Sequence, residues 1–206
     1  MRCSSRLFSI ALLLPILTSL ACAQIQSLDP NYSVSLYASG LSLPTDMVFR
    51  PTFNDLLETE ENGAIKRIDL QTGTVSVFAT FPSDLSPYKG MYHFYGIGAD
   101  SSGNVFAPAS QNAPATSPIL EFDSRGNPLT RLSFPGTAEG LALDSMNNLY
   151  VISQPIGGAP GGQLIYKYLP PYTSAPTLFA SGFGDLQTIA FNAAGYVWRG
   201  RRRQRL

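Results

Sequence analysis

Apolar residues in this chain gather in short runs of four to seven positions, separated by Gly, Pro, Asn or Ser. The runs are rich in β-branched and aromatic side chains, and beyond residue 23 no helical apolar period is sustained. Short apolar runs bounded by turn-forming residues are typical of β-strands. The pattern therefore predicts an all-β protein.

One phrase of this pattern, Gly140–Ile152, recurs in varied form along the chain. Its relatives are Asp46–Leu57, Gly96–Phe106 and Thr188–Trp198, and successive copies stand 50, 44 and 48 residues apart. Repeats of this length that hold several short strands are typical of β-propellers, in which each repeat forms one blade. We therefore expect four antiparallel strands in each complete copy.

The apolar runs also give the positions of the expected strands. In the first copy they are Asp46–Phe49, Asp55–Thr59, Ala64–Asp69 and Thr74–Ala79. In the second copy they are Ile97–Asp100, Asn104–Ala107, Ile119–Asp123 and Leu129–Phe134. In the third copy they are Leu141–Leu143, Leu149–Ser153, Gln163–Tyr168 and Thr177–Ala180. The last copy, Gln187–Trp198, supplies the first half of a further blade, so the chain holds about three and a half four-stranded blades.

The segment Ser35–Leu41 echoes Thr177–Phe183, the last strand of the third copy. We expect it to be the outer strand of a blade whose first three strands come from the C-terminal side. That closing partner is missing here, so the propeller is expected to be incomplete and truncated at the C-terminus. Such an exchange of strands closes propellers into rings and removes their open edges.

Three motifs carry a resemblance to known families. They are a Gly-Leu-Ala-Leu-Asp strand at Gly140–Asp144, the phrase Asn-Asn-Leu-Tyr-Val at Asn147–Val151, and a strand ending in Phe122 and Asp123. Over Tyr32–Trp198 the chain resembles the NHL-repeat and gluconolactonase-like propellers, which are generally six-bladed. The resemblance implies a propeller fold and leaves the function open.

Residues 1–23 are interpreted as an export signal, because a basic start is followed by the apolar stretch Leu7–Leu20 and a small-residue cleavage pattern. The body, residues 24–198, contains no cysteine and is expected to be secreted or periplasmic, with no transmembrane span once the signal is removed. Two alternatives stay open: a lipoprotein anchored through Cys22, and a retained membrane anchor, for which the apolar stretch is short.

Charge is distributed unevenly along the chain. Between residues 24 and 198, seven Lys or Arg stand against fourteen Asp or Glu, which gives a net charge of −7. A body of this charge is unsuited to phosphate backbones, so nucleic acid is not an expected partner. The last segment, residues 199–206, holds five arginines and is interpreted either as a basic tail or as the product of a shifted reading frame.

The first residues of the inner strands are the candidate binding positions, since the inner strands of a propeller surround its central channel. The repeat alignment places five channel-lining candidates: Thr45, Asp46, Tyr95, Glu139 and Gln187.

The resemblance to gluconolactonase-like enzymes implies a divalent cation in the channel, held by Glu, Asn and Asp. Their Pro-Asp-Gly-Leu motif corresponds to Ala138–Leu141, and their Pro-Asn-Gly-Leu motif to Pro44–Met47. Glu139 alone keeps a carboxylate at the matching place, because Asp46 is one residue out of step. A hard cation prefers six or more oxygen ligands, so no cofactor is assigned. Calcium stays open, with Glu139 as its candidate ligand and catalytic residue.

The segments Leu43–Phe49 and Glu60–Ile65 also resemble the start of quinone-dependent sugar dehydrogenases. Those enzymes use a histidine as general base. His93, the chain's single histidine, stands just before an inner strand, where a neutral imidazole could abstract a proton. A packed position among its aromatic neighbours is the alternative.

An acidic cluster of Glu58, Glu60 and Glu61 precedes the turn dipeptide Asn62–Gly63. Exposed charges at the end of a hairpin are commonly solvated. We expect this cluster to be a solvated hairpin end rather than a cation site.

The leading functional interpretation is an exported propeller that binds a small-molecule, glycan or protein ligand of unknown identity, or serves as a scaffold. The chain shows no Gly-x-Ser-x-Gly elbow and no His-Glu-x-x-His helix, so the motifs do not require an enzyme. A gluconolactonase-like metal-dependent hydrolase and a quinone-dependent sugar dehydrogenase are the two alternatives.

Overall fold

The computed structural model describes residues 29–82, 92–111, 117–154, 163–184, 186–192, 194–195 and 197–201. The chain divides into two compact units, residues 1–36 and 37–206. In the first unit the Oδ1 atom of Asp29 accepts hydrogen bonds from the backbone and side-chain N–H groups of Asn31. The predicted export signal and Cys22 lie outside the described residues.

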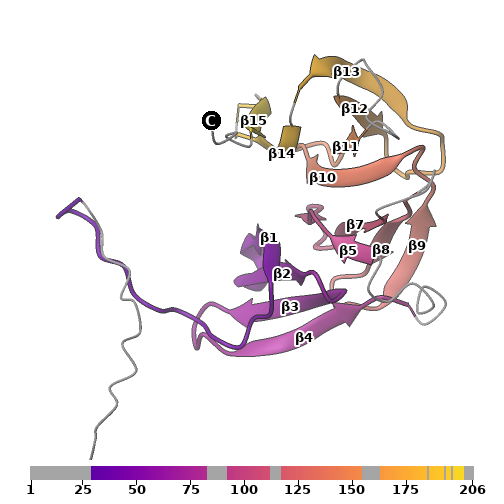
Figure 1. The fold of residues 1–206 in the computed structure, drawn as a ribbon. Coiled ribbons are helices and arrows are strands. Elements are labelled where there is room, and N and C mark those ends of the chain that lie inside the picture. Colours follow the sequence, from indigo (N-terminus) through magenta and orange to yellow (C-terminus); the bar gives the residue numbers. More distant parts are fainter. Residues whose placement is uncertain are drawn as a thin grey trace, which may run out of the picture. The chain divides into compact units, whose positions relative to one another are not determined.

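The second unit contains antiparallel sheets made of consecutive strands (Figure 1). The first sheet comprises β1 (Pro44–Arg50), β2 (Asp55–Glu60), β3 (Ala64–Asp69) and β4 (Val75–Thr80). The second comprises β5 (Tyr92–Phe94), β6 (Gly98–Ala99), β7 (Val105–Gln111), β8 (Ile119–Phe122) and β9 (Pro128–Leu132). The third comprises β10 (Thr137–Leu143), β11 (Leu149–Gln154), β12 (Gln163–Tyr168) and β13 (Thr177–Phe183). A last pair comprises β14 (Leu186–Phe191) and β15 (Val197–Arg201).

These elements confirm the predicted all-β class and its repeating four-stranded pattern. In the second sheet, β5 and β6 pair with different parts of β7, so together they take the place of one inner strand. The regular structure outside the strands is a single short 3-10 turn, η1 (Pro51–Phe53), in the described part of the chain. Among the described residues there is no helix long and apolar enough to cross a membrane.

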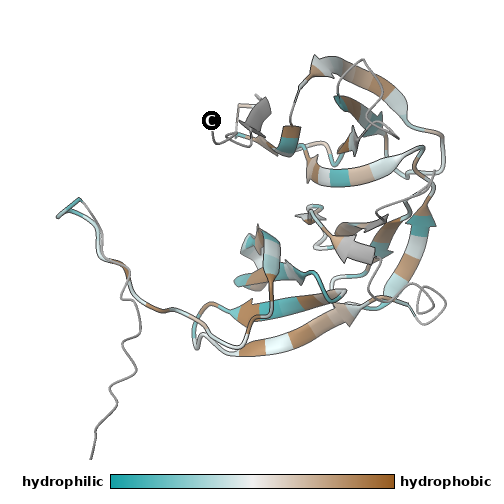
Figure 2. Ribbon diagram, in the orientation of Figure 1, coloured by the Kyte–Doolittle hydropathy of each residue, from teal (hydrophilic) through white to brown (hydrophobic). Residues whose placement is uncertain are grey.

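Alternating side chains place a core on each face of the middle strands, because successive residues of a strand point to opposite sides. In β11, Leu149 and Val151 are buried in a cluster shared with the second sheet, whereas Tyr150 and Ile152 are buried in a cluster shared with β14. Bands of apolar and polar colour succeed one another along β4 and β9 (Figure 2). Each sheet therefore shares a hydrophobic core with the next sheet along the chain.

A buried ion pair ties the first sheet to the second. The guanidinium of Arg50 donates two hydrogen bonds to the Asp55 carboxylate, at 2.9 and 2.7 Å. Its Nη1 atom also donates to the carbonyls of Gly103 and Ser124, which belong to turns of the second sheet. Arg50 and Asp55 are both almost fully buried, so this pair fixes the approach of the two sheets.

An aspartate-based turn recurs between neighbouring strands. In the third sheet, the Oδ1 atom of Asp144 accepts the backbone N–H groups of Met146 and Asn148, and its Oδ2 atom accepts the Asn148 side chain. Asp100 and Asp123 form the same arrangement with the residues that follow them. The Asp-x-x-x-Asn spacing in the repeat is therefore a device that closes turns.

The structure differs from the sequence-based prediction at the ends of the repeat. Residues 35–41 form no strand in the described structure. At the other end, β15 continues past Trp198 and pairs Arg201 with Leu186. The strand thus includes the first arginines of the 199–206 segment, whose remainder lies outside the described residues.

Candidate binding site at the bulged inner strands

Every inner strand is irregular at its predicted channel position. The register of β1 shifts around Thr45, that of β10 shifts across Glu139, and that of β14 shifts around Gln187. In the second sheet the inner strand is interrupted between β5 and β6, where Tyr95 lies. Bulges bend a strand and re-aim its side chains, and they occur often beside functional sites. The repeat therefore carries one geometric irregularity per sheet at these positions.

Thr45 and Asp46 connect the first sheet to the interruption in the second. The hydroxyl of Thr45 donates to the Phe94 carbonyl at 2.6 Å. The Oδ2 atom of Asp46 accepts the backbone N–H of Ile97 at 3.2 Å. Burial raises the pKa of Asp46, while hydrogen bonds from the N–H groups of Met47 and Ile97 oppose this rise. Both side chains are therefore engaged in joining the two sheets.

Glycines let the irregular segments of successive sheets approach closely. A Cβ atom on Gly96 would lie 3.0 Å from the carbonyl oxygen of Glu139, and one on Gly140 would lie 2.4 Å from the carbonyl oxygen of Gln187. The backbones at the predicted positions of the second sheet, the third sheet and β14 therefore approach one another closely, each against the next.

Glu139 is held by a neighbouring amide. The Nε2 atom of Gln163, a buried residue of β12, donates to the Oε2 atom of Glu139 at 3.1 Å. The Oε1 atom of Gln163 accepts the backbone N–H of Leu186 in β14. Gln163 therefore orients the Glu139 carboxylate and links it to the next sheet, a role that the repeat alignment did not reveal because Gln163 lies outside the inner strands.

Tyr95 is the aromatic residue among the five candidate positions, and 40% of its surface is exposed. Burial raises the pKa of its phenol, and the negative charges of Glu61 and Glu139 raise it further. The phenol therefore stays protonated near neutral pH and can donate a hydrogen bond. Tyr95 therefore lies within electrostatic range of two carboxylates, those of Glu61 and Glu139.

The other catalytic candidate is placed only by its backbone. His93 lies in β5, paired with Ser110 of β7, two residues before Tyr95. Its side chain lies outside what the structure describes, so its role as a general base stays a prediction.

Calcium binding by Glu139 also stays a prediction. Within the described ranges, no three His, Cys, Asp or Glu side chains gather in a group suited to a metal ion.

The acidic cluster differs from its predicted solvated state. Glu58 is 1% exposed and Glu60 is fully buried. Glu60 accepts hydrogen bonds from the Ser42 backbone and the Asn62 side chain. Neither carboxyl oxygen of Glu58 has a hydrogen-bond partner among the described residues, and burial together with the charge of Glu60 raises the pKa of Glu58 to about 7. The prediction was wrong because β2 extends to Glu60, so Glu58 and Glu60 are buried strand residues rather than exposed residues at the end of a hairpin.

The succession of four-stranded sheets that share cores and have bulged inner strands is the architecture of a β-propeller. Solved structures agree with this class. Aldose sugar dehydrogenase from Streptomyces coelicolor, in its PQQ-bound form, superposes with a TM-score of 0.61 at 18% identity, over 83% of this chain and 60% of that chain. An auxiliary nutrient binding protein from Bacteroides thetaiotaomicron gives 0.60 at 16% identity, over 79% of this chain and 36% of that one. Streptogramin B lyase gives 0.56 at 13% identity, over 82% and 50%.

These comparisons establish the fold. This chain spans between about a third and three fifths of the length of the three structures. No protein-family model and no curated protein matches the sequence. The propeller class is therefore shown, while the NHL and gluconolactonase-like assignment stays a resemblance.

Proposed function

We propose that this chain is part of an exported β-propeller binding protein whose bulged inner strands hold a polyhydroxylated ligand, such as a saccharide. The observation that supports this most directly is the placement of Tyr95 near Glu61 and Glu139 at the irregular inner-strand segments. An aromatic ring offers a face to the C–H groups of a sugar, and carboxylates and amides bind its hydroxyls.

The fold neighbours are compatible with this proposal, although one fold hosts many functions. They include a sugar dehydrogenase, a nutrient binding protein and a lyase.

The proposal is tested by calorimetric titration of the protein with a panel of mono- and disaccharides, in separate runs without added cofactor, with calcium, and with the quinone PQQ. We expect saccharide binding without either additive. We also expect Tyr95→Ala and Glu139→Gln to weaken it by about tenfold, the effect of losing one good contact. Glu121→Gln, on β8 rather than an inner strand, is the matched control.

Two other results would favour the alternatives. Tight calcium uptake that disappears in Glu139→Gln would support the hydrolase. Sugar-dependent dye reduction with the quinone that disappears in His93→Ala would support the dehydrogenase. Absence of saccharide binding under all three conditions would contradict the proposed function.

Export is a separate part of the proposal, supported by the sequence of residues 1–23. Sequencing the N-terminus of the mature protein checks it. A start at Gln24 supports secretion, a lipid-modified start at Cys22 supports the lipoprotein alternative, and an intact Met1 contradicts both.

A further inference from the structure

One position of the repeat packs each inner strand onto the sheet that precedes it in the chain. Ile97, Leu141 and Ile189 occupy this position in their copies. Each is at most 4% exposed and belongs to a core shared with the preceding sheet. Met47 is the equivalent residue of the first sheet, and it is 64% exposed. The first sheet therefore presents to solvent a residue that the other sheets bury.

A second repeat position shows the same contrast. Leu143 and Phe191 stand two residues further along their inner strands, and both pack against the cores shared with their preceding sheets. Phe49 is their equivalent in the first sheet, and half of its surface is exposed. The apolar residues of this face therefore keep the type that packs on a preceding sheet in the rest of the chain.

The charged groups of this face lie beneath its apolar ones. Residues that pair across neighbouring strands lie on the same side of a sheet, and one such row is Met47, Glu58, Lys66 and Val77. Glu58 is buried, whereas Met47 and Val77 are exposed. Terminal repeats that end an array usually present a polar outer face. The exposed apolar residues here, Met47, Phe49 and Val77, which we call the outer face, are not such a cap.

β14 presents the counterpart of the outer face. In the first and third sheets, Val48 and Ala142 pack against the core shared with the following sheet. Ala190 is the equivalent residue of β14, and it is exposed, as is Thr188 beside it on the strand. One copy of the chain therefore carries both halves of a sheet-to-sheet contact, each of them exposed.

The contact between the third sheet and β14 shows how these halves fit. Ala142 packs with Ile189 and Phe191, so a small residue lies against an aliphatic and an aromatic one. Ala190 placed against the outer face repeats this combination, since the outer face offers a methionine and a phenylalanine at the two equivalent positions. The two exposed surfaces are therefore complementary in the way that the chain's own sheets are.

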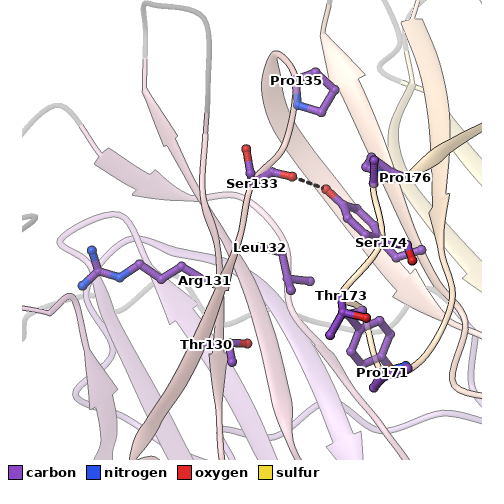
Figure 3. A pocket seen from close by; sticks show the side chains of 12 residues that line it. Thr130, Arg131, Leu132, Ser133, Pro135, Pro171, Thr173, Ser174 and Pro176 are labelled. Atoms are coloured by element: carbon purple, nitrogen blue, oxygen red, sulfur yellow. Dashed lines mark hydrogen bonds between the residues drawn. The ribbon is translucent and has the colours of Figure 1, made fainter.

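Consecutive sheets also meet at their outer strands. The hydroxyl of Tyr168 in β12 donates to the carbonyl of Ser133, which follows β9 of the preceding sheet, at 2.6 Å (Figure 3). This bond lies in the wall of a groove between β9 and residues 171–176 (Figure 3). The rest of this contact is an apolar core, so apolar surface is the main requirement for one sheet to pack on the next.

We propose that copies of this protein associate head to tail, with the Ala190 side of β14 in one copy packed on the outer face of the first sheet in another. Removal of the outer face from water drives the contact. The five arginines of residues 199–206 offset most of the net charge of −7 on residues 24–198, so long-range repulsion between copies is small. Because two different surfaces meet, the contact is heterologous.

The test begins with sedimentation velocity of the whole protein at increasing concentration, where we expect assemblies of two or more copies. Phe49→Asp places a charge in the contact and should weaken association by at least about tenfold. Leu129→Asp changes a residue of β9 that is also about half exposed, and as the matched control it should leave association unchanged.

A second pair of variants tests the other surface. Ala190→Arg places a long charged side chain on the exposed side of β14 and should also weaken association by at least about tenfold. Ala194→Arg changes an exposed alanine in the turn that follows β14 and should have no effect. All four substitutions are at exposed or half-exposed positions, and circular dichroism checks that each variant keeps its strands.

Mixing the two weakened variants identifies the contact as head to tail. Phe49→Asp keeps an intact β14 surface and Ala190→Arg keeps an intact outer face, so one of each should form a complex although each alone is monomeric. Native mass spectrometry detects this complex, because the two variants differ in mass. A contact between two identical surfaces would not be restored by mixing.

Three results would overturn the proposal. They are a monomer at every concentration, which would leave a sheet of another protein as the occupant of the outer face, equal effects of Phe49→Asp and Leu129→Asp, and no complex in the mixture. Saccharide binding at the inner strands is measured separately by calorimetry, so this proposal and the proposed function fail independently.

Discussion

Gly140 of β10 lies against the main-chain carbonyl of Gln187 in β14, so closely that a Cβ atom on Gly140 would be 2.4 Å from that oxygen. The Gly in the repeated strand phrase is therefore required for sheet-to-sheet approach. We predict that Gly140→Ala lowers the free energy of unfolding by about 1–3 kcal/mol, the usual cost of overpacking. Urea denaturation measures it. Gly184→Ala, which meets no atom within 4 Å, is the control. Equal stability of the two variants would contradict the close approach.

The Arg50 ion pair should contribute strongly to stability. Its guanidinium bonds to Asp55 and to carbonyls of two turns in the second sheet, with Phe53 and Phe78 beside it. Removing one member of a buried pair typically costs about 3–5 kcal/mol, because the other charge is left behind. We predict that Arg50→Ala lowers the free energy of unfolding by about 3 kcal/mol, at the lower end of this range, because Arg67 also bonds to Asp55.

Chemical denaturation of Arg50→Ala beside Arg125→Ala checks this prediction. Arg125 stands at an exposed turn and serves as the control for loss of an arginine. Arg50→Lys should recover little stability, because an ammonium group cannot form the two parallel bonds to Asp55. Full stability of Arg50→Lys would show that charge alone matters at this position.

The turn at Asp144 gives a third prediction. Burial tends to raise the pKa of Asp144, but hydrogen bonds from Asn148, Met146 and Tyr150 outweigh it, and the pKa is lowered overall. Asp144→Ala removes the acceptor of these donors, including the buried Asn148, and should cost about 1–3 kcal/mol. Ser145→Ala in the same turn is the control, and thermal unfolding of both variants at neutral pH measures the difference.

The sign of the pH effect follows from the lowered pKa. A carboxyl group that is more acidic in the folded protein stabilises it above its unfolded pKa, near 3.8, and this stability is lost as pH falls through the folded value. The stability gap between the native protein and Asp144→Ala should therefore narrow below about pH 4. A gap that stays constant to low pH would contradict a role for the ionised carboxylate.

Much of this fold was predictable because its strands are short apolar runs bounded by turn-forming residues. Leu149 to Ile152 of β11 are apolar on both faces, as expected for a strand buried between two sheets. The Asp-x-x-x-Asn turns were not predicted, and the structure shows them through the hydrogen bonds that Asp100, Asp123 and Asp144 accept from the residues that follow. The segment Ser35–Leu41 was less predictable, because a strand depends on a partner edge that local sequence does not contain.

The candidate site was predictable only in part. Alignment of the repeats proposed Thr45, Tyr95, Glu139 and Gln187 as binding positions. The strand register shifts at Thr45, Glu139 and Gln187, and the inner strand is interrupted at Tyr95. The alignment could not find Gln163, whose contact with Glu139 comes from a strand distant in sequence. Nor could it find the groove at β9, since its walls come from two different sheets.

The burial of Glu58, which was predicted to be solvated, gives the last prediction. Its pKa is raised to about 7 by burial and by the charge of Glu60, whereas the ordinary value is 4.5. A carboxyl group that holds its proton more tightly in the folded protein stabilises it fully below the unfolded pKa, and this stability is lost as pH rises through the folded value. The native protein should therefore lose stability between about pH 5 and 8.

Glu58→Gln keeps the shape of the side chain but cannot ionise, so it should be more stable than the native protein at pH 8, with a smaller difference at pH 5. Chemical denaturation of both proteins across this range measures the two curves, and parallel curves would show that Glu58 does not titrate there.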